Sequence, residues 1–125
     1  MSIDLNYQIS QFIKLKMLDK QEKIIGLVEN KIQVVISQPN ISDFSKNLKK
    51  TMEIFSETSE CFIVTSSEEE LTNKIIEQYE LSKSFISLDF KNFATLFNLY
   101  NKENELQKSL MIIDKSCQIV HKDIL

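Results

Sequence analysis

The chain has 125 residues, a net charge of −3 and a hydrophobic content of 42%. This size and composition predict one globular domain spanning residues 1–125. The negative charge argues against a nucleic-acid partner or an acidic membrane surface. All fifteen Lys and Arg positions are lysines, which lack the bidentate fork that arginine offers to phosphate and guanine. One glycine, Gly26, and one proline, Pro39, exclude a glycine-rich phosphate loop.

Targeting signals and metal-binding patterns are not recognisable in the sequence. No apolar run approaches the length of a membrane span, and the first residues lack the basic start and apolar core of a signal peptide. Two cysteines, Cys61 and Cys117, and one histidine, His121, supply neither a disulfide scaffold nor a set of metal ligands. We therefore expect a cytoplasmic protein without a metal ion or another cofactor.

Three apolar segments in the first third of the chain have the patterns of strands. Residues 12–18 alternate apolar and lysine side chains, which is typical of a half-buried strand near a sheet edge. Residues 23–28, around Gly26, fit either a strand or a turn. Residues 32–37 (IQVVIS) are rich in β-branched side chains, and this run predicts a central, buried strand.

Two helices and a second central strand are predicted in the middle of the chain. After Pro39, Ser42 or Asp43 can cap a helix, because their side-chain oxygens can accept from its first amides. Residues 61–65 (CFIVT) predict the strand, and the acids of residues 68–70 favour the first turn of the next helix, after Ser66 and Ser67. The apolar stripes of the two helices are Phe44, Leu48, Met52 (or Thr51) and Phe55, and Leu71, Ile75, Ile76 and Tyr79.

The last forty residues predict a short strand, a helix and a hairpin. Asp89 precedes apolar residues at helical spacing, from Phe90 to Tyr100, and is the expected acidic N-cap. Two apolar runs, residues 110–113 and 118–124, are joined by Asp-Lys-Ser-Cys, which is typical of a β-hairpin.

Two motifs stand out in this part of the chain: Ser87-Leu88-Asp89-Phe90 at the start of the helix, and Leu106-Gln107-Lys108-Ser109-Leu110 leading to Asp114. They resemble the C-terminal half of the bacterial thiol peroxidases, the atypical two-cysteine branch of the peroxiredoxins. With the order of elements, the resemblance covers about residues 12–125. It implies an α/β, thioredoxin-like fold in its peroxiredoxin variant, with a central mixed sheet flanked by helices. The fold is expected to be trimmed at both ends, without most of an N-terminal hairpin and without a final helix over one sheet face.

The resemblance also locates a degenerate active site. Thiol peroxidases use a cysteine thiolate in the first turn of the helix after the first central strand, with a threonine three residues before it and an arginine nearby. Counted without a gap from Ser37, the threonine position falls on Asn40 and the cysteine position on Asp43. A slip of one or two residues would give Ser42 or Ile41. No position in this window holds a thiol.

The supporting positions of the family site are also replaced. Lys108 stands at the arginine position, and isoleucines at 75–76 stand where relatives carry the resolving cysteine. A hydroxyl or carboxylate is not a comparable nucleophile toward a peroxide bond, so loss of the family reaction is implied. Asp43 is interpreted most simply as an N-cap. An ion pair with Lys108 is a hypothesis, and its alternative is a surface lysine with its stem against apolar side chains.

The remaining candidates have ordinary structural interpretations. Cys61 opens a central strand and is expected to be a buried, inert thiol. Cys117 occupies the hairpin turn, where relatives favour glycine or asparagine, and is expected to be exposed and open to oxidation or an intersubunit disulfide. His121 is interpreted as an edge-strand side chain, and the lysines of residues 46–50 and the acids of 68–70 as solvated helix surface.

The leading hypothesis is a non-catalytic thiol-peroxidase-like protein with a structural or regulatory protein-binding role. The exposed sheet face would be covered by residues 1–11 of the chain, or by a homodimer or another protein partner. The alternative is a thiol-dependent peroxidase or thiol redox sensor acting through Cys117 or Cys61, with peroxide and a thioredoxin-type reductant as its reactants.

Overall fold

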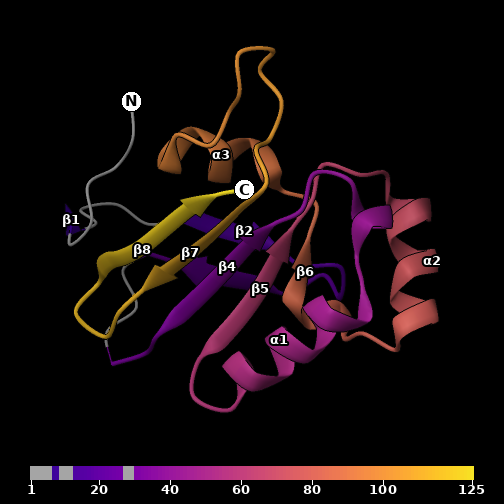
Figure 1. The fold of residues 1–125 in the computed structure, drawn as a ribbon, viewed down its shortest axis with the longest axis horizontal. Coiled ribbons are helices and arrows are strands. Elements are labelled where there is room, and N and C mark those ends of the chain that lie inside the picture. Colours follow the sequence, from indigo (N-terminus) through magenta and orange to yellow (C-terminus); the bar gives the residue numbers. More distant parts are fainter. Residues whose placement is uncertain (1–6, 9–12, 27–29) are drawn as a thin grey trace.

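A computed structural model describes residues 7–8, 13–26 and 30–125, which form an α/β arrangement (Figure 1). The large sheet has the strand order β1-β8-β7-β4-β5-β6, and β2 pairs with β3 in a small sheet. The strands are β1 (Tyr7–Gln8), β2 (Ile13–Lys16), β3 (Glu22–Ile25), β4 (Gln33–Ser37), β5 (Glu60–Val64), β6 (Ile86–Ser87), β7 (Ser109–Ile113) and β8 (Gln118–Ile124). The helices are α1 (Lys46–Ser56), α2 (Glu69–Tyr79) and α3 (Phe90–Phe97), with short 3-10 helices η1 (Ile41–Asp43) and η2 (Lys83–Phe85).

The large sheet is mixed, as the resemblance to thiol peroxidases implies. Strand β4 pairs in parallel with β5 and β5 in parallel with β6, whereas β4 is antiparallel to β7 and β7 to β8. The central strands at 32–37 and 61–65 and the C-terminal hairpin are therefore confirmed to within a residue of their expected bounds.

The N-terminal hairpin differs from the expectation, because β2 and β3 form an antiparallel pair where most of a hairpin was expected to be missing. The ambiguous segment 23–28 contributes to β3, and its last two residues lie outside the described ranges. The hairpin is fastened to β6 by an N–H of Leu18 that donates to the carbonyl of Ile86 (2.9 Å). Asp89 takes part as well, since its Oδ2 accepts from the N–H of Lys16 (2.7 Å). Asp89 is the N-cap residue of α3, as predicted, although its side chain makes no capping hydrogen bond.

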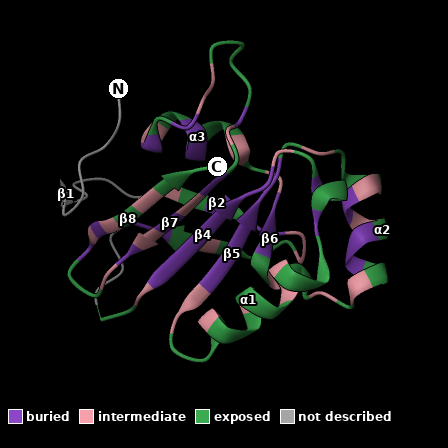
Figure 2. Ribbon diagram, viewed as in Figure 1, coloured by how far each residue is buried: buried purple, intermediate pink, exposed green. Residues whose placement is uncertain are grey.

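Each face of the large sheet has its own apolar core. Helices α1 and α2 lie on one face, and the β2–β3 hairpin and α3 lie on the other (Figure 1). Side chains alternate between the faces, so Val35 points to the α3 core and Val34 and Ile36 to the α1–α2 core. Every residue of β4 is buried, and Figure 2 shows the buried band continuing into β5.

Gln33 is a buried polar residue that the sequence analysis did not identify. Its side chain is fully buried at the start of β4. Its Oε1 accepts from the N–H of Gly26 (3.0 Å), and its Nε2 donates to the carbonyl of Ile24 (2.8 Å) and to Oε1 of Glu60 (3.3 Å). Gln33 thus supplies hydrogen-bond partners to the end of β3 and joins the hairpin to the central strand.

Replacing Gln33 with leucine should lower the free energy of unfolding by about 2–4 kcal/mol, because the Gly26 N–H and the Ile24 carbonyl would lose their partners. Urea unfolding followed by circular dichroism measures the difference. Gln78→Leu, at an exposed position of α2, is the matched control and should change the free energy by less than about 0.5 kcal/mol. Equal stability of the two variants would contradict the role given to Gln33.

Candidate functional site

The segment after β4 forms two short elements rather than one continuous helix. Residues of η1 make a 3-10 turn, after which Phe44 is extended (φ −60°, ψ 140°). Helix α1 then starts at Lys46, and Ser45 is its N-cap, with its hydroxyl accepting from the N–H of Leu48 (3.1 Å). The predicted cap at Ser42 or Asp43 is therefore wrong. The physical reason is Phe44, whose buried ring packs on Tyr79 at 4.9 Å between centroids and whose extended backbone interrupts the helix.

The residues at the family's catalytic positions do not form a constellation. Asn40, Ser42 and Asp43 are exposed, and the side chain of Asn40 accepts from the N–H of Ser42 (3.1 Å). Lys108 is also exposed, just before β7. In the ranges 7–8, 13–26 and 30–125, the ion pair present is Lys31–Glu60, so the hypothesised pair of Asp43 with Lys108 does not form.

Side-chain hydroxyl groups connect the segments that follow β4 and β5, at the carboxyl ends of these strands. The carbonyl of Pro39 accepts from the hydroxyls of Thr65 (3.3 Å), Ser66 (3.1 Å) and Ser67 (3.1 Å). The Ser67 hydroxyl also accepts from the N–H of Ile41 (2.9 Å). Ser67 is consequently turned toward the β4–η1 loop and not toward α2, whose N-cap is Glu68 without a capping side-chain hydrogen bond. The run Thr-Ser-Ser, which begins at the last residue of the predicted strand 61–65, was the available signal for this network.

A cavity of about 600 Å³ opens beside this network, at the carboxyl ends of the parallel strands. Residues that follow β4 and β5, the first residue of α3 and the loop before β7 contribute its walls. The lining residues are Pro39, Asn40, Ser66, Phe90, Asn101, Asn104, Glu105 and Leu106. No thiol and no cationic side chain lies among them.

Cys61 lies at the amino end of β5, opposite Val34, and therefore at the far end of the strand from this cavity. Its side chain is buried, as expected, and burial raises the pKa of the Cys61 thiol to about 12. A thiol in this state is almost entirely protonated at neutral pH and is a poor nucleophile.

Cys117 is also buried, and the prediction that it is exposed is wrong. Asp114 organises the turn by accepting from the N–H groups of Ser116 and Gln118 (2.9 Å each), and the N–H of Asn30 donates to the carbonyl of Lys115 (3.1 Å). Cys117, the last residue of this turn, is thereby directed inward, with φ 62°. The turn follows Ile113, which is paired with Gln33 at the amino end of β4, so Cys117 is likewise remote from the cavity.

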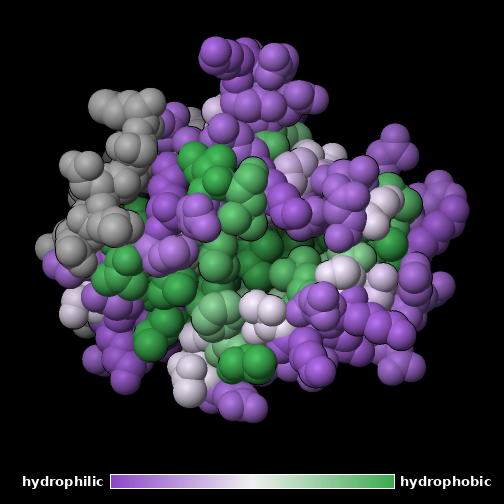
Figure 3. All heavy atoms as spheres, viewed as in Figure 1, coloured by the Kyte–Doolittle hydropathy of each residue, from purple (hydrophilic) through white to green (hydrophobic). Residues whose placement is uncertain are grey.

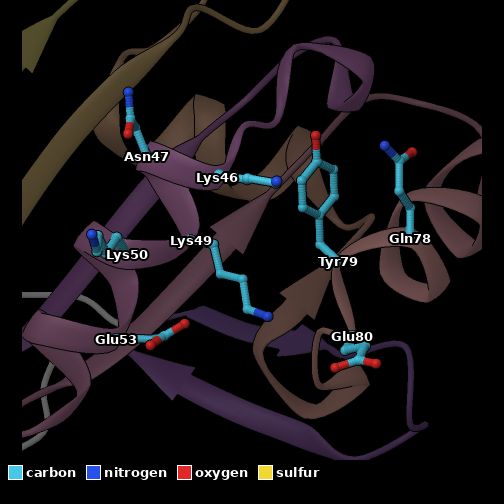
Figure 4. A pocket seen from close by; sticks show the side chains of 8 residues that line it. All are labelled: Lys46, Asn47, Lys49, Lys50, Glu53, Gln78, Tyr79 and Glu80. Carbon is cyan, nitrogen blue, oxygen red and sulfur yellow. The ribbon is translucent and has the colours of Figure 1, made fainter.

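A second cavity of about 560 Å³ lies between α1 and the end of α2. Figure 4 shows Lys46 extending from α1 toward Tyr79, and Lys49 extending toward the part of the groove where Glu53 and Glu80 lie. The lysines that the sequence analysis interpreted as solvated surface thus line a groove in which acids offset part of their charge.

Among the described residues there is no group of three or more His, Cys, Asp or Glu side chains placed to hold a metal ion. No helix in the described part of the chain is both long and apolar enough to cross a membrane.

No protein-family model and no curated protein sequence matches the chain, but solved structures with the same arrangement include peroxiredoxins and thiol-disulfide oxidoreductases. A peroxiredoxin-like protein from Aquifex aeolicus is 18% identical, with a TM-score of 0.77 over 100% of this chain and 78% of its own. AhpC from Mycobacterium tuberculosis is 13% identical, with a TM-score of 0.79 over 100% and 84%. A thiol peroxidase from Chromobacterium violaceum is 9% identical, with a TM-score of 0.70 over 100% and 78%. The fold is the thioredoxin-like fold of the peroxiredoxins.

This agreement confirms the fold that the sequence motifs implied. At these identities the structural agreement shows only the arrangement of the backbone. The chemistry of this chain depends on the residues that it carries. In this chain the helix after β4 has no sulfur in its first turn, and both cysteines lie at the opposite end of the sheet.

Alkylation of the folded protein by iodoacetamide at pH 8 should be slow at Cys61. Its pKa of about 12, against 9.0 for the unperturbed thiol, reduces the thiolate fraction by about a thousandfold. Peptide mapping by mass spectrometry at timed intervals measures the rate, and the same protein in urea is the control. Labelling of Cys61 in the folded protein at the rate seen in urea would contradict the burial described here.

Proposed function

We propose that this protein is a peroxiredoxin-like scaffold that performs no peroxidase chemistry and acts by binding protein. The observation that carries the first half of the proposal is the sulfur-free segment from Asn40 to Lys46, between β4 and α1. Attack on a peroxide O–O bond needs a thiolate, and neither a carboxylate nor a hydroxyl replaces it.

The environment of the two thiols argues against their taking over the reaction. Cys61 has a raised pKa and is packed among apolar side chains between the sheet and the helices α1 and α2. Cys117 is buried in the turn before β8. Reactive cysteines are usually partly exposed and lie near cationic groups or a helix N-terminus. The peroxidase or thiol-sensor alternative therefore has no geometric support at either thiol.

An apolar surface on the α1–α2 side of the sheet supports the second half of the proposal. Leu110 and Ile112 of β7 pair with Ile36 and Val34 and so point to this face, where both are only partly buried. Among the described elements no helix lies over β7 and β8 on this side (Figure 1), and Figure 3 shows apolar side chains gathered at the centre of this face. Contiguous exposed apolar surface of this kind is typical of a protein interface.

The edge of this surface favours a second copy of the chain as the partner. In the β7–β8 register, His121 lies opposite Ile112 and Asp123 opposite Leu110, so both polar residues border the apolar centre. A twofold dimer uses the same patch on both subunits, and the patch must therefore be self-complementary. An apolar centre bordered by a basic and an acidic side chain meets this requirement, because His121 of each copy can face Asp123 of the other.

Helix α1 provides a further apolar contribution to the proposed interface. Met52 and Glu53 line a groove against the segment after α2, so the flank with Thr51 and Ile54 is turned away from that groove. Ile54 is 65% exposed, and its side chain would add apolar area to the proposed interface.

The first prediction from this proposal concerns catalysis. Purified protein supplied with hydrogen peroxide and dithiothreitol should consume peroxide no faster than a variant with both cysteines replaced, Cys61→Ala with Cys117→Asn. Asparagine is chosen at position 117 because it tolerates the positive φ there. Peroxide loss followed by a colorimetric assay is the measurement. Turnover in the unaltered protein that disappears in this variant would establish the thiol-peroxidase alternative.

The second prediction concerns self-association. Ile54→Lys should raise the dimer dissociation constant at least about tenfold, because an apolar side chain in the interface becomes a buried charge. Sedimentation velocity over a concentration series measures the constant. Ile24→Lys is the matched control, since Ile24 is an exposed isoleucine (43%) on β3, away from the proposed interface, and should leave the constant unchanged. A monomer at every concentration, or an equal effect of both variants, would refute the dimer.

A further inference from the structure

The cavity at the carboxyl ends of the parallel strands has the position and size of a small-molecule site. The residues that follow β4 and β5, and the first residue of the helix after β6, all contribute to it. Ligands of open α/β sheets bind in the crevice outside the carboxyl ends of such strands. Its volume of about 600 Å³ is within the usual range for small-molecule pockets. Figure 1 shows the loop between α3 and β7, which forms one wall, projecting beyond this end of the sheet.

The charge of the lining is unusual for a chain with fifteen lysines, because it contains one carboxylate and no cation. The carboxylate belongs to Glu105, which has no ion pair among the residues that the structure describes. Its Oε1 accepts from Nδ2 of Asn101 (3.4 Å), a neutral group. The cavity is therefore suited to a cationic or neutral ligand and unsuited to an anion.

The loop that carries Glu105 is held in a defined shape. Oδ1 of Asn101 accepts from the N–H groups of Glu103 and Glu105 (2.9 Å each), and the N–H of Asn101 donates to the carbonyl of Glu105 (2.8 Å). Two lining groups in this region remain available: the side-chain amide of Asn104 and Nδ2 of Asn40 have no hydrogen-bond partner among the described residues. The Asn104 amide oxygen can accept from a donor on the ligand.

Apolar side chains complete the lining. Pro39, Phe90 and Leu106 form the rest of the wall, with the half-buried Phe90 ring at the start of α3. A carboxylate and an amide oxygen beside an aromatic ring match a ligand with several N–H donors on an apolar body, and an aromatic face also attracts a cation.

We propose that this cavity binds a small organic ammonium ligand. The ammonium group donates to the carboxylate of Glu105 and the amide oxygen of Asn104, and the apolar body packs against Phe90, Pro39 and Leu106. The proposal involves no covalent step and is independent of the dimer and of the absence of peroxidase activity.

Benzylammonium is the probe, because it combines an aromatic body with one primary ammonium group. Benzyl alcohol, a neutral analogue of nearly the same shape, and benzoate, an anionic one, are the matched ligands. Each is titrated into isotopically labelled protein and followed by two-dimensional ¹H–¹⁵N NMR. Benzylammonium should shift the amide signals of Asn40, Ser66 and the loop 101–106, with a dissociation constant about three- to fivefold lower than that of benzyl alcohol. Benzoate should bind more weakly than either.

Two variants test the residues involved. Glu105→Gln keeps an acceptor for Asn101 and removes the charge, so the preference for benzylammonium over benzyl alcohol should disappear. Asn104→Gly removes the amide while accommodating φ 60°, and should weaken benzylammonium binding. Glu103→Gln, in the same loop but outside the lining, is the control and should preserve the preference.

Three results would overturn the proposal. These are benzoate binding as tightly as benzylammonium, a preference for benzylammonium that survives in Glu105→Gln, and signal shifts that lie away from the cavity, for example around residues 68–70.

Discussion

Strand β4 is hydrogen-bonded along both edges and buried on both faces, and the positions of the other elements follow from this constraint. Its parallel partner β5 requires a crossover, which α1 supplies, and its antiparallel partner β7 continues through a short turn into β8. Val34 and Ile36 anchor the α1–α2 core, and Val35 anchors the core under α3. Because every side chain of β4 is buried, a shift of one residue in its register would exchange the two cores.

The same constraint separates the two ends of the sheet chemically. At the carboxyl end of β4, the chain turns through Pro39 into a loop held by hydroxyl groups, and the cavity opens beside it. At the amino end lie Gln33, Cys61 and the turn with Cys117. Thiol peroxidases carry their reactive thiol at the first of these ends, whereas both cysteines of this chain lie at the second. The fold depends on the apolar pattern, which does not require the cysteine.

The sequence predicted the elements whose patterns are long and regular. The local pattern of side chains is enough to predict three of them. These are the strand from the β-branched run at 32–37, the strand from the run at 61–65, and the hairpin around residues 114–117. The α1 cap could not be assigned in the same way, because Ser42, Asp43 and Ser45 are all good capping residues. The choice of Ser45 follows from the long-range contact of Phe44 with Tyr79. The burial of Cys117 depends on packing of the turn against residue 30, and the buried state of Gln33 on the β2–β3 hairpin, and neither contact is visible in a local pattern.

The central claim is that the scaffold is present without an accessible, activated thiolate. The most direct test is to expose the folded protein to one equivalent of hydrogen peroxide with dimedone, which traps sulfenic acids, and to determine the intact mass and the modified peptide. The account predicts no dimedone adduct at Cys61 or Cys117 over the time in which an equal concentration of a low-molecular-weight thiol is oxidised. Rapid, stoichiometric formation of an adduct at either cysteine of the folded protein would contradict it.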